Sequence, residues 1–499
     1  MSGLIRISGG SSSGSTGGGS NTPPTIKNFR STEQTANTIT IKYLAEDIQN
    51  AILRHYIYID GIKKEITDDV KWDKSNNEFT YQLTQLNKEQ IYNIQIEVSD
   101  SIDIARTDIL NISTKNFLVY GISVDETNYN PNTSVKYIDD AIGFTPAFKS
   151  NLGSWADKFI IPKIKIVGFK NGSVTKEIDP YNKTQYIDGE VVPSDVDVMA
   201  EIPKFYWNFS NTEKGYELRI SEDKVDDNYV CYAHQVNNKE KDHIYIGVYQ
   251  GSESNGKLIS KSGVSLNSSS PSKKNISQIR ECLKNNGSGY QVFNWFSLMM
   301  VQIIFTVMYK SLNFRERMGC SYRGQEITGF GDTKGLFYAG INSGQYGNTN
   351  VFCGIEDMPP NFPIFIDGIY EDTNDNDNKI RTVKVNLNNS LFDLYTTNYN
   401  FVEKINVYQN ETDKTYYGSI NKVFHSNELG FWGVEFNGSN NLGYCSDFYY
   451  SYSNSTYMSI VTQLSGYGGS GNKGIYALRT NNSFSDINHY YYRLVYLGE

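Results

Sequence analysis

Short runs in which apolar and polar residues alternate fill the stretch from residue 22 to residue 115. Residues 38–42 alternate in this way, residues 56–59 do so up to the turn pair Asp60 and Gly61, and residues 92–98 alternate again. Successive side chains of a strand point to opposite faces, so this period of two is typical of strands that are buried on one side. The spacing of the runs predicts an all-β domain, a small antiparallel sandwich.

Two helices are predicted in the second half of the chain. Ile276, Ile279 and Leu283 recur at helical spacing, and Gly287 stands where a C-terminal glycine belongs. Residues 292–309 then run for eighteen positions without a charge, a length at the threshold for a membrane span. The run contains four polar residues, so we predict a buried core helix and no membrane insertion. With the short strands that follow, these helices predict an α+β region.

Four segments are expected along the chain. Residues 1–21 are rich in Gly and Ser and form a flexible tether, whose opening MSGLIRI either attaches to a larger assembly by adding a strand or is only part of a linker. Residues 22–115 form the sandwich. Residues 116–238 read as a β-rich connecting region of strands and long loops, and residues 239–499 form the large α+β domain.

Composition and charge exclude several classes of protein. The 499 residues include 46 Lys and Arg against 55 Asp and Glu, a net charge of -9, which gives no reason to expect a nucleic-acid partner. The five cysteines, an odd number, are not spaced like a disulfide framework or a zinc site. The first residues lack an apolar stretch of signal-peptide length, so Sec export is not expected.

The sequence gives only weak signals for metal-binding or catalytic residues. The stretch 371–379, EDTNDNDNK, lacks the glycine and the glutamate of a calcium-binding EF-hand loop, and an exposed hairpin tip is the favoured interpretation. Asp125, Asp139 and Asp140 prompt a metal hypothesis, although isolated loop carboxylates are usually solvated. The five histidines show no ligand spacing and no Ser or Cys partner. We therefore predict no metal, no cofactor and no catalysis.

The last stretch, residues 443–496, has the composition of a binding surface. It holds eleven tyrosines interleaved with Ser, Asn and Gly, and it carries almost no charge. Tyr offers a large amphipathic ring at low entropic cost, while Ser, Asn and Gly supply adaptable hydrogen bonds. Because a strand alternates faces, about half of the rings are expected to pack inside instead.

Residues 22–115 resemble a fibronectin type III domain. Leu86 stands six residues before Tyr92, which opens an alternating strand, as in that family's tyrosine corner. The stretch has no cysteine, which also fits, but the buried Trp of an early strand is missing because Trp72 is the sole Trp there. The resemblance implies a spacer or adaptor.

Residues 119–499 resemble the C-type-lectin-fold tail-fibre and receptor-binding proteins of bacteriophages, which include tropism determinants and the variable proteins of diversity-generating retroelements. Five passages carry the resemblance in family order: YGISVDETNYN with YIDDAIGFTPA, MAEIPKFYW, IYIGVYQGS through LKNNGSGYQVFNW, GIEDMPPNFPIFIDGI, and GIYALRTNNSFSDINHYYYRLVY. The chain departs from the family's GN-x-W-x-W-x-DG phrase, since Phe362 and Phe365 stand in an altered, proline-rich context. The resemblance implies a multidomain protein with a lectin-like receptor-binding head.

In this family, ligand contacts come from the C-terminal strands and loops. Carried over onto this sequence, the implied ligand-binding residues are Tyr450, Tyr452, Asn454, Tyr457, Tyr467, Asn472, Arg479, Asn481, Asn482, Asn488, His489 and Tyr490. The implied core positions are Ile475, Ala477, Leu478, Leu494 and Val495. Binding would rest on aromatic stacking and on hydrogen bonds from Asn and Ser. Several copies in one fibre would strengthen the overall binding.

The resemblance therefore implies a receptor-binding protein at the tail tip of a phage or a phage-tail-like bacteriocin. Its partners would be a host cell-surface glycan or surface-layer protein, and baseplate or tail proteins through the N-terminus, in a homotrimer. A bacterial surface adhesin is the first alternative. The second is an oxidase of the formylglycine-generating type, whose fold is similar, although Cys353 and Cys445 have no nearby Lys, Arg or His in the sequence that would lower a thiol pKa.

Overall fold

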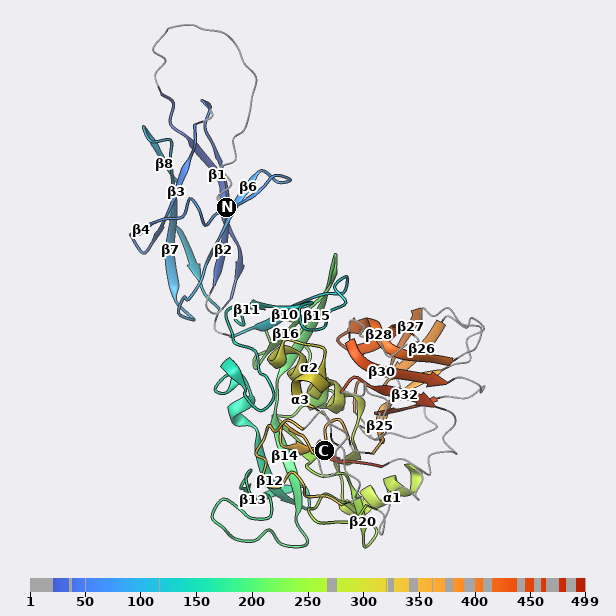
Figure 1. Cartoon of the computed structure of the whole chain (residues 1–499). Helices are drawn as coiled ribbons and strands as arrows, with labels where there is room; N and C mark the ends of the chain where they lie inside the picture. The colour runs from blue at the N-terminus through green and yellow to red at the C-terminus, as the bar shows by residue number, and fades with distance from the viewer. Residues whose placement is uncertain are drawn as a thin grey trace. The chain divides into compact units, whose positions relative to one another are not determined.

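The computed structural model divides the chain into two compact units, Met1–Val119 and Tyr120–Glu499 (Figure 1). Each unit has its own hydrophobic core. The structure describes residues 21–498 apart from 36–37, 50, 116, 267–275, 320, 322–326, 341–348, 361, 373–379, 390–399, 407–414, 438–444, 453–458, 464–474 and 482–490. The described residues form mainly β-strands, so the chain is a β-rich multidomain protein.

The first unit consists of two antiparallel sheets that share one core. Along β2 the residues alternate between buried and half-buried, and Ile39, Ile41 and Tyr43 point into that core. The strands predicted at 38–42, 56–59 and 92–98 are confirmed as β2, β3 and β7. One sheet has the order β1 (Thr25–Gln34), β2 (Ile39–Glu46), β6 (Glu78–Leu83), β5 (Lys71–Asp73); the other has β4 (Ile62–Glu65), β3 (Arg54–Ile59), β7 (Ile91–Ser99), β8 (Ile104–Arg106), with β9 (Leu110–Ser113) also paired to β7.

Tyr92 joins strand β7 to the turn that precedes it. Its ring is buried, and its hydroxyl oxygen accepts a hydrogen bond from the backbone N–H of Asn87 at 2.7 Å. Leu86, one residue earlier, packs half-buried against the same core. This is the contact expected of a tyrosine corner.

The second unit contains three larger sheets and three short hairpins. The four-stranded sheet is β11 (Val135–Asp139), β10 (Tyr120–Asp125), β16 (Gly215–Ser221), β15 (Tyr206–Thr212). The six-stranded sheet is β13 (Ser173–Ile178), β12 (Lys165–Lys170), β14 (Asp197–Pro203), β19 (His243–Gly247), β33 (Leu494–Tyr496), β22 (Tyr290–Val292). The hairpins are β17 (Gln235–Val236) with β18 (Lys239–Glu240), β20 (Ser252–Ser254) with β21 (Lys257–Ile259), and β23 (Val351–Phe352) with β24 (Ile355–Glu356).

The third large sheet has eight strands and holds most of the C-terminal third. Its strands are antiparallel except for the pair β30 and β32, which is parallel. The order is β27 (Phe401–Asn406), β26 (Ile380–Val385), β25 (Ile364–Asp372), β31 (Ser459–Gln463), β32 (Leu478–Asn481), β30 (Cys445–Tyr452), β28 (Thr415–Ser426), β29 (Gly430–Asn437). Strands β25 and β26 pair antiparallel on either side of residues 373–379, and the predicted hairpin tip itself lies outside the described residues.

The six-stranded sheet unites segments that lie far apart in the sequence. Strand β14, from the predicted connecting region, pairs with β19, and β19 pairs with β33 at the C-terminus. Residues 116–238 and 239–499 therefore contribute neighbouring strands to one sheet.

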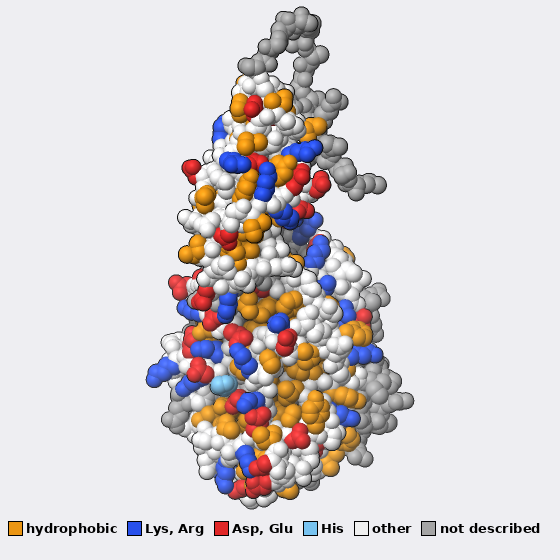
Figure 2. Space-filling view, turned by 90° about the vertical axis from the view of Figure 1, so that its left-hand side faces the viewer, with side chains coloured by type: hydrophobic (Ala, Val, Ile, Leu, Met, Phe, Trp, Pro, Cys, Tyr) orange, Lys and Arg blue, Asp and Glu red, His pale blue; other side chains and the backbone are white. Residues whose placement is uncertain are grey.

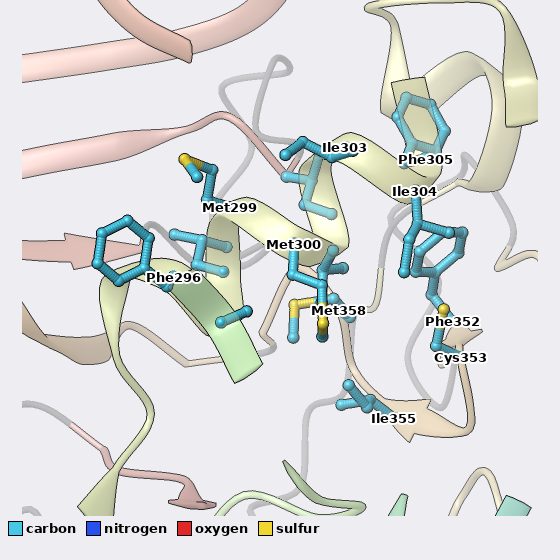
Figure 3. Packing of buried hydrophobic residues seen from close by; sticks show 14 of the residues in the cluster. Phe296, Met299, Met300, Ile303, Ile304, Phe305, Phe352, Cys353, Ile355 and Met358 are labelled. Atoms are coloured by element: carbon cyan, nitrogen blue, oxygen red, sulfur yellow. The ribbon is translucent and has the colours of Figure 1, made fainter. Parts of the chain in front are cut away.

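The predicted buried helix is α2 (Trp295–Tyr309), and all fifteen of its residues are buried. The Asn294 side chain accepts a hydrogen bond from the backbone N–H of Ser297 at 2.9 Å and so caps the first turn. Figure 3 shows apolar side chains on several sides of this helix, with Phe352 and Cys353 packed near Ile304. Of the helices in the described part of the chain, none is long and apolar enough to cross a membrane.

The other helices are short. The amphipathic helix is confirmed as α1 (Ile276–Asn286), in which Ile276, Ile279 and Leu283 are buried, and Gly287 follows it with φ of +125°. The remaining helices are α3 (Phe314–Met318), η1 (Gly153–Trp155), η2 (Ile161–Lys163) and η3 (Tyr232–His234).

Candidate functional site

Three neighbouring strands carry the part of the expected binding site that the structure describes. Strand β32 lies between β30 and β31, and of these strands the backbone is described. Tyr450 on β30 is the register partner of Arg479 on β32, and Asn481 on β32 is the partner of Ile460 on β31. Tyr452 pairs with Thr415 on the other side of β30. The fold thus brings Tyr450, Tyr452, Arg479 and Asn481 onto adjoining strands.

The other eight residues expected to bind ligand lie outside the described residues. They are Asn454, Tyr457, Tyr467, Asn472, Asn482, Asn488, His489 and Tyr490. They belong to the segments that connect or follow strands β30, β31 and β32, at 453–458, 464–474 and 482–490.

The five expected core positions are confirmed as buried. Ile475, Ala477, Leu478, Leu494 and Val495 are all buried. The side-chain amide of Gln302, in the middle of α2, donates to the carbonyl of Ile475 at 3.1 Å. The hydroxyls of Thr306 and Tyr476 also form a hydrogen bond. Helix α2 therefore anchors the segment that leads into β32.

Several C-terminal tyrosines belong to the interior. Tyr476, Tyr491 and Tyr492 are buried, and Tyr496 is half-buried against Phe169 and Tyr290. Of the four tyrosines in this stretch whose side chains are described, all take part in packing. This agrees with the expectation that a fraction of the rings is structural.

Arg493 is a buried residue that the sequence analysis did not single out. Its side chain is fully buried, and its guanidinium donates to the carbonyl oxygens of Gly247 at 2.7 Å, Val248 at 2.8 Å and Glu356 at 2.9 Å. A guanidinium has five donors, so it can bind several carbonyls at once. Arg493, which directly precedes β33, thus joins the C-terminal segment to the end of β19 and to β24.

Burial disfavours the charged form of two cysteines and three histidines among the described side chains. Cys353 is fully buried, and burial raises the pKa of its thiol well above the usual value; burial likewise raises the pKa of Cys231 to about 12. Burial lowers the pKa of His55, His234 and His425 to about 4, so these rings are neutral at physiological pH. Cys445 lies in β30, and its side chain is outside the described part of the structure.

The acidic residues considered for a metal do not meet. Strand register places Asp139 opposite Tyr120 at one end of the β10–β11 hairpin, while Asp125 follows Val124 at the other end. Asp139 instead accepts a hydrogen bond from Arg219 at 2.9 Å. Among the described residues, no group of three or more His, Cys, Asp or Glu side chains is placed to hold a metal ion.

A groove of about 880 Å³ lies within the second unit, and none of the residues predicted to bind ligand is in its lining. Its lining includes residues of β27 and β29, the two edge strands of the eight-stranded sheet. The sheet is therefore curved so that both of its edges border the same groove. Figure 1 draws β27 beside β28 accordingly. The lining comes from the turn after β10 (126–129), the β15–β16 turn (211–215), and residues 404–406, 422–426 and 434–435.

No sequence signal pointed to this groove. Its lining residues come from segments separated by up to about three hundred positions, and none of them belongs to a recognisable motif. Three lining residues, Glu126, Thr127 and Tyr129, lie inside one of the passages that carry the family resemblance, YGISVDETNYN.

The charges on the surface are mixed. Figure 2 shows a face of the molecule on which Lys and Arg side chains are interspersed with Asp and Glu and with apolar side chains. Salt bridges of the second unit include Lys165 with Glu177 at 2.9 Å and Lys170 with Asp195 at 2.6 Å. This face therefore does not present a field of one sign.

Comparisons with known proteins give no family. No protein-family model matches the chain, and no curated protein matches it. One similar solved structure is a chimeric titin Z1Z2-Z1Z2 tandem functionalized with a GRGDS exogenous peptide from fibronectin. It is 10% identical, with 45% of this chain and 91% of that chain covered and a TM-score of 0.15. A similarity at this level carries no conclusion about function.

Proposed function

We propose that this chain is a receptor-binding protein at the tip of a tail fibre, in a phage or a phage-tail-like bacteriocin. It binds a host bacterial surface glycan or surface-layer protein without catalysis. The observation that carries the proposal is the placement of Tyr450, Tyr452, Arg479 and Asn481 on adjoining strands above a packed core. A rigid scaffold that presents aromatic and amide-bearing residues suits binding.

The first unit is proposed to be a fibronectin type III-like spacer. Its two-sheet strand order and the hydrogen bond between Tyr92 and Asn87 support this assignment. The second unit is proposed to be a C-type-lectin-like head, because its five sequence passages occur in the same order as in that family. In this arrangement the N-terminal tether attaches the protein to the baseplate or tail, and three copies form one fibre tip.

A binding role is favoured over the oxidase alternative by the state of Cys353. That alternative needs a reactive thiolate, and thiolates form where the thiol is accessible and its pKa is low. The Cys353 thiol is buried among Ile304 and Phe352, and its pKa is raised. A thiol in such an environment remains protonated and packs as a small apolar group.

The test is binding of the full chain to a glycan array and to purified surface layers from a panel of bacteria. We expect saturable binding to at least one glycan or surface layer. The double variant Tyr450→Ala with Arg479→Ala should weaken that binding at least tenfold. A tenfold loss corresponds to about 1.4 kcal/mol, within reach of one lost aromatic anchor.

The control is a double variant in which a tyrosine and an arginine outside the proposed site are replaced by alanine. Tyr181 is 69% exposed in the head and lies outside the C-terminal strands, and Arg54 is exposed on β3 of the first unit. Tyr181→Ala with Arg54→Ala should bind as the wild type does. Equal binding by both double variants would refute the proposed site. No binding to any glycan or surface layer would refute the proposed function.

A further inference from the structure

The groove between the four-stranded and eight-stranded sheets has balanced charge. It contains three carboxylates and three ammonium groups, from Glu126, Glu213, Glu435, Lys214, Lys404 and Lys422. His425 also lines it and is neutral, because burial lowers the pKa of its ring to about 4. A space in which the charges cancel gives no net attraction to a strongly charged ligand.

Glu126 is the central polar group of the groove. Burial raises the pKa of its carboxyl, while the positive charge of Lys422 and a hydrogen bond from the backbone of Val423 oppose that rise. Its Oε1 atom is buried and makes no hydrogen bond within the described part of the protein. A buried acceptor without a donor is costly, so a ligand that donates a hydrogen bond here would remove that cost.

Apolar and aromatic surface lies beside these polar groups. Tyr129 is 59% exposed, and Phe424 is half-buried in the same lining. The amides of Asn211 and Asn406 add groups that both donate and accept hydrogen bonds. A sugar ring has the matching chemistry, since it presents an apolar C–H face and hydroxyls that donate and accept at once.

We propose that this groove is a second ligand site, which binds a neutral, hydroxyl-rich oligosaccharide. Its volume of about 880 Å³ falls within the range of small-molecule sites, and its mixture of donors, acceptors and exposed aromatic surface suits uncharged hydroxyls. The site goes beyond the proposed function, because none of its lining residues belongs to the C-terminal strands β30, β31 and β32.

An extended peptide is the competing occupant, because the groove is lined by the edge strands β27 and β29. A peptide that adds as a strand needs free backbone groups along an edge. The edge strands contribute only residues 404–406 and 434–435 to the lining, a stretch too short to pair with an added strand, and the backbone N–H of Val423 on β28 is already bonded to Glu126. The saccharide is therefore the better fit.

The experiment uses the full chain and three probes. Calorimetric titration and saturation-transfer NMR compare neutral tetrasaccharides of hexose and N-acetylhexosamine with sulfated tetrasaccharides and with an eight-residue extended peptide. We expect saturable binding of a neutral tetrasaccharide and at least tenfold weaker binding of the sulfated form. Glu126→Gln and Tyr129→Ala should each weaken the neutral ligand at least tenfold.

Matched variants separate the groove from general effects on the fold. Glu201 is half-buried on β14 and Tyr181 is exposed, and both lie outside the groove lining, so Glu201→Gln and Tyr181→Ala should bind the tetrasaccharide as the wild type does. Tyr129 is largely exposed, so its replacement tests the site without disturbing the core. For Glu126→Gln, an unchanged thermal transition verifies that the core is intact.

Each outcome decides the inference. Full binding by both groove variants, a preference for the sulfated probe or the peptide, or no binding of any neutral tetrasaccharide overturns it. The variant Tyr450→Ala with Arg479→Ala should keep tetrasaccharide binding. If it loses surface-layer or glycan-array binding while the groove variants change nothing, the proposed function stands and the groove inference fails.

Discussion

The guanidinium of Arg381 lies 3.1 Å from a carboxylate oxygen of Glu371, and both side chains are almost completely buried, at 3% and 1% exposure. Glu371 on β25 is the register partner of Val383, two residues from Arg381 on β26, and on its other side it is the register partner of Ser459 on β31. This ion pair therefore lies in the sheet that carries the proposed receptor-binding strands. Removing one member of a buried pair leaves an uncompensated charge.

The first prediction follows from that pair. Arg381→Met should lower the free energy of unfolding of the head by about 3–5 kcal/mol, whereas the double variant Arg381→Met with Glu371→Leu should recover most of the loss. Differential scanning calorimetry of the full chain measures both, with the transition of the first unit as an internal reference. The control is Lys224→Met, which breaks the exposed pair with Asp227 and should cost less than about 1 kcal/mol. Equal effects of Arg381→Met and Lys224→Met would contradict the assignment.

The hydroxyl of Tyr92 stabilises the first unit by its bond to Asn87. Tyr92→Phe keeps the buried ring and removes the acceptor of the Asn87 N–H, so the free energy of unfolding of that unit should fall by about 0.5–1.5 kcal/mol. Tyr56→Phe is the control, since it keeps the ring over which Lys63 lies at 4.0 Å. The measurement is denaturant unfolding of the first unit's transition. If the two variants lose the same stability, the hydroxyl contact has no special role.

Gly430 begins β29, and its backbone has φ of +54°. A Cβ added there would lie 2.5 Å from the Cγ and Sδ atoms of Met299 on α2. Gly430→Ala combines left-handed strain with overpacking and should destabilise the head by about 2–4 kcal/mol. Gly189→Ala, with φ of +86° and open space around it, carries only the strain and should cost about 1–2 kcal/mol. A thermal shift for Gly430→Ala no larger than that for Gly189→Ala would rule out the clash with Met299.

Elements with a local signal were predictable from the sequence. Residues 292–309 lack charge and contain helix-compatible residues throughout, and the structure buries them as α2 from Trp295 onward. The alternation at 38–42 and 92–98 likewise reports which faces of β2 and β7 meet the core. For β2 and β7 the period of the pattern equals the period of the backbone, and for α2 the uninterrupted apolar run indicates a helix buried on all sides, so the neighbours in sequence suffice.

Features that depend on distant segments were not predictable. Arg493 has no charged neighbour in sequence that explains its burial, because its carbonyl partners at Gly247, Val248 and Glu356 arrive only through the fold. The groove around Glu126 and His425 is likewise assembled from separate turns and edge strands. The parallel pairing of Tyr450 with Arg479 is also non-local, so hydropathy cannot reveal it.

The stability of the head should depend on pH through His234. This ring is fully buried, and its Nε2 atom lies 3.1 Å from the carbonyl oxygen of Ile202, to which it donates as a neutral imidazole. Burial lowers the pKa of His234 from 6.5 to about 4. The unfolded chain therefore binds a proton below pH 6.5 that the folded chain does not bind until about pH 4. Stability is fully present above pH 6.5 and falls as the pH decreases toward 4, by about 2 kcal/mol between pH 7 and pH 5 for this one group.

Calorimetry of the head transition from pH 7 to pH 5 checks this dependence in the wild type and in His234→Gln. The glutamine amide can still donate to Ile202 but cannot titrate, so the slope of stability against pH should decrease. It should not vanish, because burial also lowers the pKa of His425 to about 4 and that group acts in the same direction. His243→Gln, at an exposed position on β19, is the matched control for replacing a histidine by glutamine. An unchanged slope in His234→Gln would mean that the acid sensitivity of the head arises from other groups.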